Sequence, residues 1–158
     1  MLALLIPSLA LASMLALGRE HSTTSPDLCS LLTEAEAETI LSQKLEPPQP
    51  QKSGDCWYLR EGGKDLPDVE VMLSVLPVHL RSEREFDDFV AEQVKSLNKA
   101  MKEAGGMEFQ AQRVENVGAP AYFVDPGLYV LQGGRVLVIA ADRPKAVAIA
   151  AKALPRFK

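Results

Sequence analysis

The 158-residue sequence predicts one small α+β domain, in which an antiparallel sheet of about five strands carries three packed helices. Two long segments have helical apolar spacing behind capping motifs. Short runs of alternating apolar residues are separated by turns that contain Gly or Pro. The length leaves room for a single core. The expected order of elements is α-β-β-α-β-β-β-α.

The three helices are expected at residues 33–45, from Ser82 to the Gly105-Gly106 pair, and at residues 144–154. Thr33-Glu34-Ala35-Glu36 and Ser82-Glu83-Arg84-Glu85 both have the capping-box pattern, in which a hydroxyl and a carboxylate satisfy the first free amides. The second helix has the clearest apolar stripe, formed by Phe86, Phe89, Val90, Val94, Leu97 and Met101. The third helix is rich in alanine and begins with Pro144, which suits a first-turn position.

Apolar runs that are candidate strands occupy residues 56–60, 69–78, 107–114, 121–124, 128–132 and 135–141. The last two are joined by Gly133-Gly134, which predicts a tight hairpin because both positions favour positive φ. A two-residue loop fixes the register of the hairpin. Four pairs of opposite residues follow from it: Leu128 with Ile139, Tyr129 with Val138, Val130 with Leu137, and Leu131 with Val136.

The N-terminal segment is expected to be a targeting sequence. Residues 2–17 are almost all apolar, and this run is too short to span a bilayer comfortably. We therefore expect a signal peptide at residues 1–18, a polar linker at 19–28 and the domain at 29–158. No Lys or Arg precedes Arg19, which is unusual for a signal peptide. The alternatives are a start further upstream, a buried N-terminal helix and an uncleaved membrane anchor.

Cys29 and Cys56 are the only cysteines, and an even number in an exported chain indicates a disulfide. The loop between them contains Pro47-Pro48-Gln49-Pro50, which a helix interior excludes. Two free buried thiols or a nucleophilic cysteine remain alternatives. Cys29 lies well beyond the apolar run and follows Pro26-Asp27-Leu28, so a lipid anchor at this cysteine is not expected.

Charge and motifs give no sign of catalysis or of nucleic-acid binding. The net charge is −4 and the basic residues are scattered, which argues against a phosphate-binding surface. His79, Glu83 and Asp87 would share a face on a continuous helix, but Ser82 predicts that the helix starts after His79. No nucleophile motif or phosphate-binding loop is present. We predict no catalytic residue, no metal site and no cofactor.

The final hairpin gives the one indication of a binding surface. Both of its faces are apolar, so both must be covered, or one is left for a partner or ligand. The candidate surface comprises Tyr129, Leu131, Val136 and Val138, with Trp57 as a further candidate. The alternatives are burial of both hairpin faces near the centre of the sheet, and a core position for Trp57 beside the disulfide.

Four short motifs resemble a family of uncharacterised exported lipoproteins best known from actinobacteria. They are residues 27–37 (DLCSLLTEAEA), 56–58 (CWY) and 117–122 (VGAPAY), and the Ala-rich final helix, so the resemblance covers roughly residues 27–154. It implies an extracytoplasmic α+β domain with a disulfide between Cys29 and Cys56, and no agreed activity. The chain departs from this family because it lacks the lipid-attachment motif, which favours a soluble protein.

These observations favour a non-enzymatic extracytoplasmic protein of the cell envelope, periplasm or secreted fraction. We expect it to bind an envelope protein or a small apolar ligand. A membrane tether is expected only if the signal segment stays uncleaved. The alternatives are a structural envelope protein without a ligand and an enzyme with unrecognised carboxylate machinery, which a pocket of strongly perturbed carboxylates would support.

Overall fold

The computed structural model describes residues 27–64, 68–104 and 106–158. Within these ranges the chain forms a 3-10 turn, η1, three helices and seven strands. The elements are η1 (Leu28–Ser30), α1 (Glu34–Leu41), β1 (Gln49–Pro50), β2 (Cys56–Leu59), β3 (Val69–Val75), α2 (Glu83–Glu103), β4 (Gln112–Arg113), β5 (Ala121–Val124), β6 (Gly127–Gln132), β7 (Arg135–Ala140) and α3 (Arg143–Ala153). The expected signal peptide at 1–18 and linker residues 19–26 lie outside the described residues.

The strands form one antiparallel sheet in the order β1-β2-β3-β7-β6-β5-β4. The α+β class and the three helices are confirmed, but the sheet has seven strands rather than about five. The order of elements becomes α-β-β-β-α-β-β-β-β-α. One additional strand, β1, lies inside the Pro-rich loop, and Pro50 is tolerated there because an edge strand does not need every N–H.

The run at residues 107–114 was expected to be a full strand, and this is corrected to the two residues of β4. The neighbouring strand β5 has only four residues, and its ladder pairs are with Gln112 and Arg113, followed by one backbone bond from Val114 N–H to the Ala121 carbonyl at 3.0 Å. The preceding segment lies against α2 instead. Asn98 Nδ2 donates to the Phe109 carbonyl at 2.9 Å, and Phe109 N–H donates to Asn98 Oδ1 at 2.6 Å. The side-chain amide thus takes the place of a neighbouring strand at this edge.

The predicted hairpin register is confirmed at all four pairs in β6 and β7. Helix boundaries differ slightly from the prediction. α1 ends at Leu41, because Ser42 adopts a left-handed conformation with φ 56°. The capping box at Thr33 is present, whereas at Ser82 only half of it forms, since the Glu85 carboxylate accepts from Arg81 N–H instead. α3 begins at Arg143, because Asp142 caps it.

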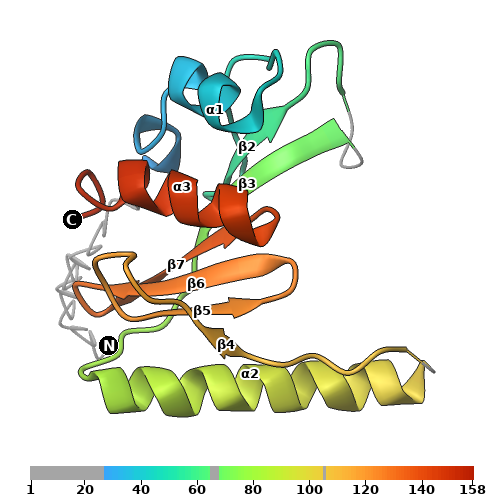
Figure 1. Cartoon of the computed structure of the whole chain (residues 1–158), viewed down its shortest axis with the longest axis vertical. Helices are drawn as coiled ribbons and strands as arrows, with labels where there is room; N and C mark the ends of the chain where they lie inside the picture. Colours follow the sequence, from blue (N-terminus) through green and yellow to red (C-terminus); the bar gives the residue numbers. More distant parts are fainter. Residues whose placement is uncertain (1–26, 65–67, 105) are drawn as a thin grey trace, which may run out of the picture.

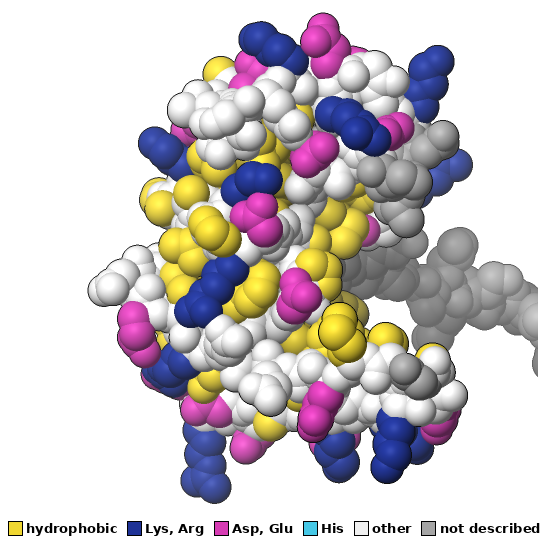
Figure 2. Space-filling view, turned by 45° about the vertical axis from the view of Figure 1, so that its right-hand side comes forward, with side chains coloured by type: hydrophobic (Ala, Val, Ile, Leu, Met, Phe, Trp, Pro, Cys, Tyr) yellow, Lys and Arg dark blue, Asp and Glu magenta, His cyan; other side chains and the backbone are white. Residues whose placement is uncertain are grey.

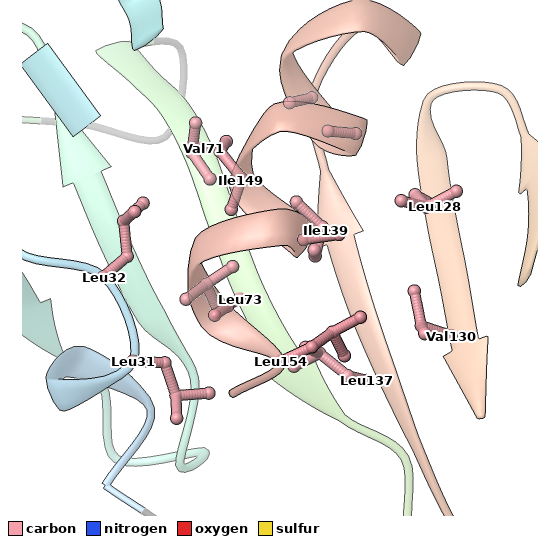
Figure 3. Close-up of a cluster of buried hydrophobic side chains, with 14 of the residues drawn as sticks. Leu31, Leu32, Val71, Leu73, Leu128, Val130, Leu137, Ile139, Ile149 and Leu154 are labelled. Carbon is pink, nitrogen blue, oxygen red and sulfur yellow. The ribbon is translucent and has the colours of Figure 1, made fainter. Parts of the chain in front are cut away.

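The sheet separates two clusters of buried side chains. On one side η1, α1 and α3 cover β2, β3, β7 and β6, and the larger cluster lies there. Figure 3 shows side chains of the sheet and of α3 meeting in it, among them Val71, Leu73, Ile139 and Ile149. On the other side α2 covers a smaller cluster that contains Phe86, Val90, Val124 and Val136. Figure 1 shows the axis of α2 roughly aligned with those of β5 and β6, at the end of the sheet opposite β2.

Charged side chains lie mainly on the outside of these layers. Figure 2 shows hydrophobic side chains gathering in the middle of one face, while Lys and Arg side chains project outward at the end formed by α2. Among the described residues, no side chain that ordinarily carries a charge is buried.

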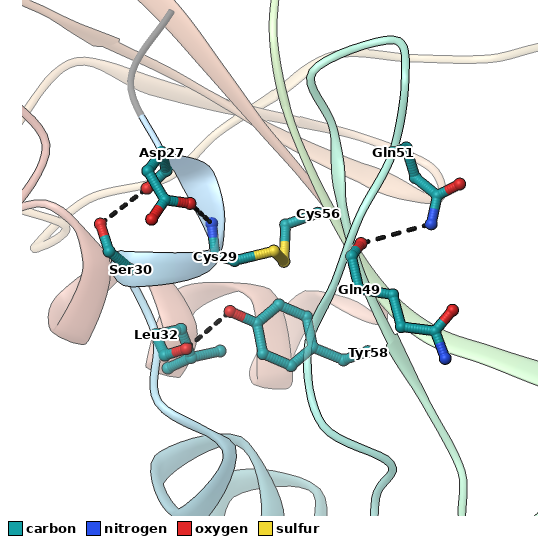
Figure 4. Close-up of a disulfide and its surroundings, with 8 residues drawn as sticks. All are labelled: Asp27, Cys29, Ser30, Leu32, Gln49, Gln51, Cys56 and Tyr58. Carbon is teal, nitrogen blue, oxygen red and sulfur yellow. Dashed lines mark hydrogen bonds between the residues drawn. A yellow bond between two sulfur atoms is a disulfide. The ribbon is translucent and has the colours of Figure 1, made fainter.

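The predicted disulfide is present and links η1 to β2 (Figure 4), with Cys29 and Cys56 Cα atoms 5.2 Å apart. Asp27 caps η1 by accepting from Cys29 N–H at 3.1 Å. Beside the disulfide, the buried Tyr58 hydroxyl donates to the Leu32 carbonyl at 2.6 Å, and burial raises the pKa of Tyr58. The N-terminal turn is therefore held to the sheet by a covalent bond and a buried hydrogen bond.

The C-terminal end is fastened to α1 by an ion pair with a defined pH dependence. Arg156 donates to both Glu36 oxygens at 2.7 and 2.8 Å and to the Leu31 carbonyl at 3.0 Å. The Arg156 hydrogen bond, assisted by the Thr33 N–H, lowers the pKa of Glu36 from 4.5 to about 2. Because the folded-state pKa is depressed, the resulting stability is present above pH 4.5 and is lost as pH falls toward 2.

We therefore expect Glu36→Gln to unfold at a lower temperature than the wild type at pH 6, and the difference to disappear near pH 2. Thermal unfolding followed by circular dichroism across this range measures it. Glu34→Gln is the matched control, because Glu34 lies in the same helical turn but does not contact Arg156. A wild-type advantage of equal size at both pH values would contradict the assignment.

Candidate functional site

The side of the sheet that faces α2 carries two rows of neighbouring side chains. In the first row Trp57 pairs with Met72, and Met72 with Ala140. In the second row Ser74 pairs with Val138, Val138 with Tyr129, Tyr129 with Tyr122, and Tyr122 with Arg113. Residues that pair across antiparallel strands point to the same face, so the two rows bring side chains from six strands together.

The cover that α2 provides decreases along the second row. At its β4–β5 end, the Tyr122 ring lies 5.7 Å from that of Phe86, and Arg113 pairs with Glu83 of α2. In the middle, Tyr129 and Val138 pack against the α2 cluster but are only half-buried. Trp57 in β2 and Met72 in β3 belong to neither buried cluster and are also half-buried.

We call the part of this face beyond α2 the open strip, and define it as Trp57, Met72, Ser74, Val138 and Tyr129. It contains no ionisable side chain other than the Tyr129 phenol, whose pKa is raised by burial. The indole N–H of Trp57 is enclosed without a hydrogen-bond acceptor. Within the described ranges the Tyr129 hydroxyl also has no hydrogen-bond partner. The open strip is thus a largely apolar surface with one enclosed and unsatisfied polar atom, the Trp57 indole nitrogen.

The predicted surface residues separate into two groups. Tyr129, Val138 and Trp57 lie in the open strip. Leu131 and Val136 pair with each other one row further from Trp57, where Leu131 is half-buried and Val136 is fully buried against Phe86 and Val90. A partner can therefore reach Tyr129, Val138 and Trp57 with α2 in place, but it can reach Val136 only if α2 moves.

Met72 and Ser74 complete the surface, although they were not singled out from the sequence. They alternate with Val71 and Leu73, which are fully buried on the other face of β3. What the sequence does not reveal is that β3 pairs with β7, because this contact joins strands that α2, β4, β5 and β6 separate along the chain. This pairing places Ser74 beside Val138 and Met72 beside Ala140.

α2 is attached to the domain along one flank, on the side of β4. Arg113 pairs with Glu83 and lies 3.9 Å from Asp87, and the Tyr122 hydroxyl donates to Asp87 at 3.0 Å. The bond to Glu83 is the main cause that raises the pKa of Arg113. Asn98 continues the same flank toward Phe109. α2 is therefore held to the sheet by these polar contacts on its β4 side as well as by the buried Phe86 and Val90.

Metal ligation, membrane spanning and perturbed carboxyl groups were considered next among the described residues. Within these ranges no group of three His, Cys, Asp or Glu side chains is placed to hold a metal ion, and no helix is both long and apolar enough to cross a membrane. The carboxyl groups with a lowered pKa are Glu36, Glu38 and Asp142. A cation or backbone amide beside each accounts for the shift: Arg156, Leu45 N–H and Lys145, respectively.

Three surface hollows of about 330, 310 and 520 Å³ lie away from the open strip. The first is beside Arg113 and Pro120, and the other two lie on either side of Met107, a side chain that is 83% exposed. No carboxyl group with a lowered pKa lines any of the three hollows. The open strip therefore remains the candidate binding surface.

Comparisons with protein-family models, with curated proteins and with solved structures gave no match to this chain.

Proposed function

We propose that this chain is a non-enzymatic exported domain that binds an envelope protein, or a small apolar ligand, on the open strip. One observation carries the proposal: Trp57 and Tyr129 stand half-buried beside Met72 and Val138, with their polar atoms unpaired. Trp, Tyr and Met are enriched in binding interfaces, because they combine a large apolar body with a polar or adaptable end. A partner that supplies a hydrogen-bond acceptor would satisfy the Tyr129 hydroxyl and cover the apolar surface.

Export is supported by the disulfide, since such bonds persist in oxidising compartments. The resemblance to exported lipoproteins adds to this proposal through the short motifs around Cys29 and Cys56. A structural envelope role without a ligand is the second candidate. It would require the open strip to remain unoccupied in the cell envelope.

Photo-crosslinking in the cells that produce the protein tests binding directly. A photoreactive residue at Met72 is expected to give a discrete adduct, and its mass separates a protein partner from a small ligand. The same residue at Lys99, an exposed position on α2, is the control. Intact-mass analysis of the product also shows whether it begins near Arg19 with both cysteines oxidised. The absence of an adduct at Met72, or equal adducts at both positions, would reject a binding role for the strip.

A further inference from the structure

We propose that Met107 is a modification site, at which a peroxide oxidises the thioether to the sulfoxide while the domain stays folded. The described residues contain two cysteines and three methionines, Met72, Met101 and Met107. Cys29 and Cys56 are joined in the disulfide, so within these ranges no free thiol competes for an oxidant. The readily oxidised sulfur that remains is that of the methionines.

Exposure separates Met107 from the other two methionines. Met107 is 83% exposed, whereas Met72 and Met101 are half-buried. Two surface hollows, of about 310 and 520 Å³, lie on either side of Met107, so its side chain can be approached from both. An oxidant must touch the sulfur to transfer an oxygen atom, and exposure therefore decides which methionine reacts first.

Met101 is close to Met107 in the sequence, but the turn between them shields it. Gly106 N–H donates to the Met101 carbonyl at 2.8 Å. The backbone of Gly106 lies against the Met101 methyl group, since a Cβ added at Gly106 would be only 2.2 Å from Met101 Cε. Met72 is shielded in another way, because it lies within the sheet between its ladder partners Trp57 and Ala140.

The fold does not rely on the Met107 side chain, which belongs to neither buried cluster. The segment that follows it is held through the backbone of Phe109, whose carbonyl and N–H bond to Asn98 at 2.9 and 2.6 Å. A sulfoxide is more polar than a thioether, so it disrupts a packed core but suits a side chain that faces water. Oxidation at Met107 is therefore compatible with the folded domain.

Hydrogen peroxide is the only co-reactant that the step needs. A lone pair of the Met107 sulfur attacks one oxygen atom of the peroxide, an S–O bond forms and the O–O bond breaks. The proton on the transferred oxygen passes to the leaving hydroxide, which departs as water. The sulfur is oxidised and the peroxide is reduced by the same electron pair. Methionine sulfoxide reductases reverse the change, so the modification is reversible.

Dilute hydrogen peroxide, added to the folded protein purified from producing cells, tests the proposal. Trypsin places Met72, Met101 and Met107 in different peptides, and Met1 and Met14, outside the described residues, in another. Mass spectrometry then follows the added oxygen at each position. Met107 is expected to react at least about tenfold faster than Met72 or Met101. In urea the difference is expected to disappear, because unfolding exposes all three side chains.

Met107→Leu removes the sulfur and keeps an apolar side chain of similar size, so it is expected to lose the fast phase of oxygen uptake. Met101→Leu is the matched control and is expected to keep that phase. In the folded protein, oxidation of Met72 or Met101 as fast as Met107 would overturn the proposal. Once Met107 alone has reacted, the urea midpoint is expected to be unchanged, and a lower midpoint would contradict a modification that the folded domain tolerates.

Discussion

Replacing Cys29 and Cys56 by alanine is expected to lower the free energy of unfolding by about 3–4 kcal/mol. The disulfide joins residues 27 positions apart, so its loss frees a loop of that length in the unfolded chain. The loop contains the Pro-rich segment and α1, and its N-terminal end places Leu31 and Leu32 in the core. Urea unfolding at neutral pH, followed by far-UV circular dichroism, measures the change.

Reductant provides the matched control for this prediction. Reducing the wild-type protein should bring its stability close to that of the Ala variant, whereas the variant itself should not respond to reductant. A loss below about 1 kcal/mol would mean that Tyr58 and the leucines of η1 hold this segment without the covalent link. The same result would weaken the case for export, because the disulfide would then contribute little to the folded chain.

Local sequence signals predicted the elements whose causes are local. Thr33, Ser82 and Pro144 marked helix starts because caps and first-turn prolines act within a few residues. Gly133-Gly134 fixed the register of β6 and β7 for the same reason, since both glycines have positive φ. The full strand predicted at residues 107–114 was wrong because its formation depends on contacts that are distant in the sequence. Their alternation is that of a strand, but the length of β5 and the position of Asn98 decide whether a ladder forms.

The candidate site was only partly predictable for a related reason. Periodicity showed that Tyr129 and Val138 share a face, and the register of the hairpin followed from its turn. That Trp57 and Met72 join the same surface depends on β3 lying between β2 and β7. Which part of the surface stays open depends on α2 being fastened along one flank by Arg113 and Asn98. These contacts link residues far apart in the sequence, and no local pattern encodes them.

The attachment of α2 predicts a large difference between two apolar residues of the same helix. Phe86 is completely buried and contacts the ring of Tyr122, whereas Leu97 is 36% exposed. Phe86→Ala is expected to cost about 3–5 kcal/mol, because truncating a buried aromatic leaves a cavity between α2 and the sheet. Leu97→Ala is expected to cost less than about 1 kcal/mol. Urea unfolding of both variants measures the difference.

Hydrogen exchange locates the effect within the chain. In Phe86→Ala, faster exchange is expected in α2 and in residues 106–113, while β2, β3 and the disulfide region keep their protection. Such a pattern would mean that the layer beside the open strip can loosen without unfolding the larger core. Equal losses for the two variants, or uniform exchange across the domain, would contradict attachment through the N-terminal half of α2. The open strip would then have no fixed boundary at α2.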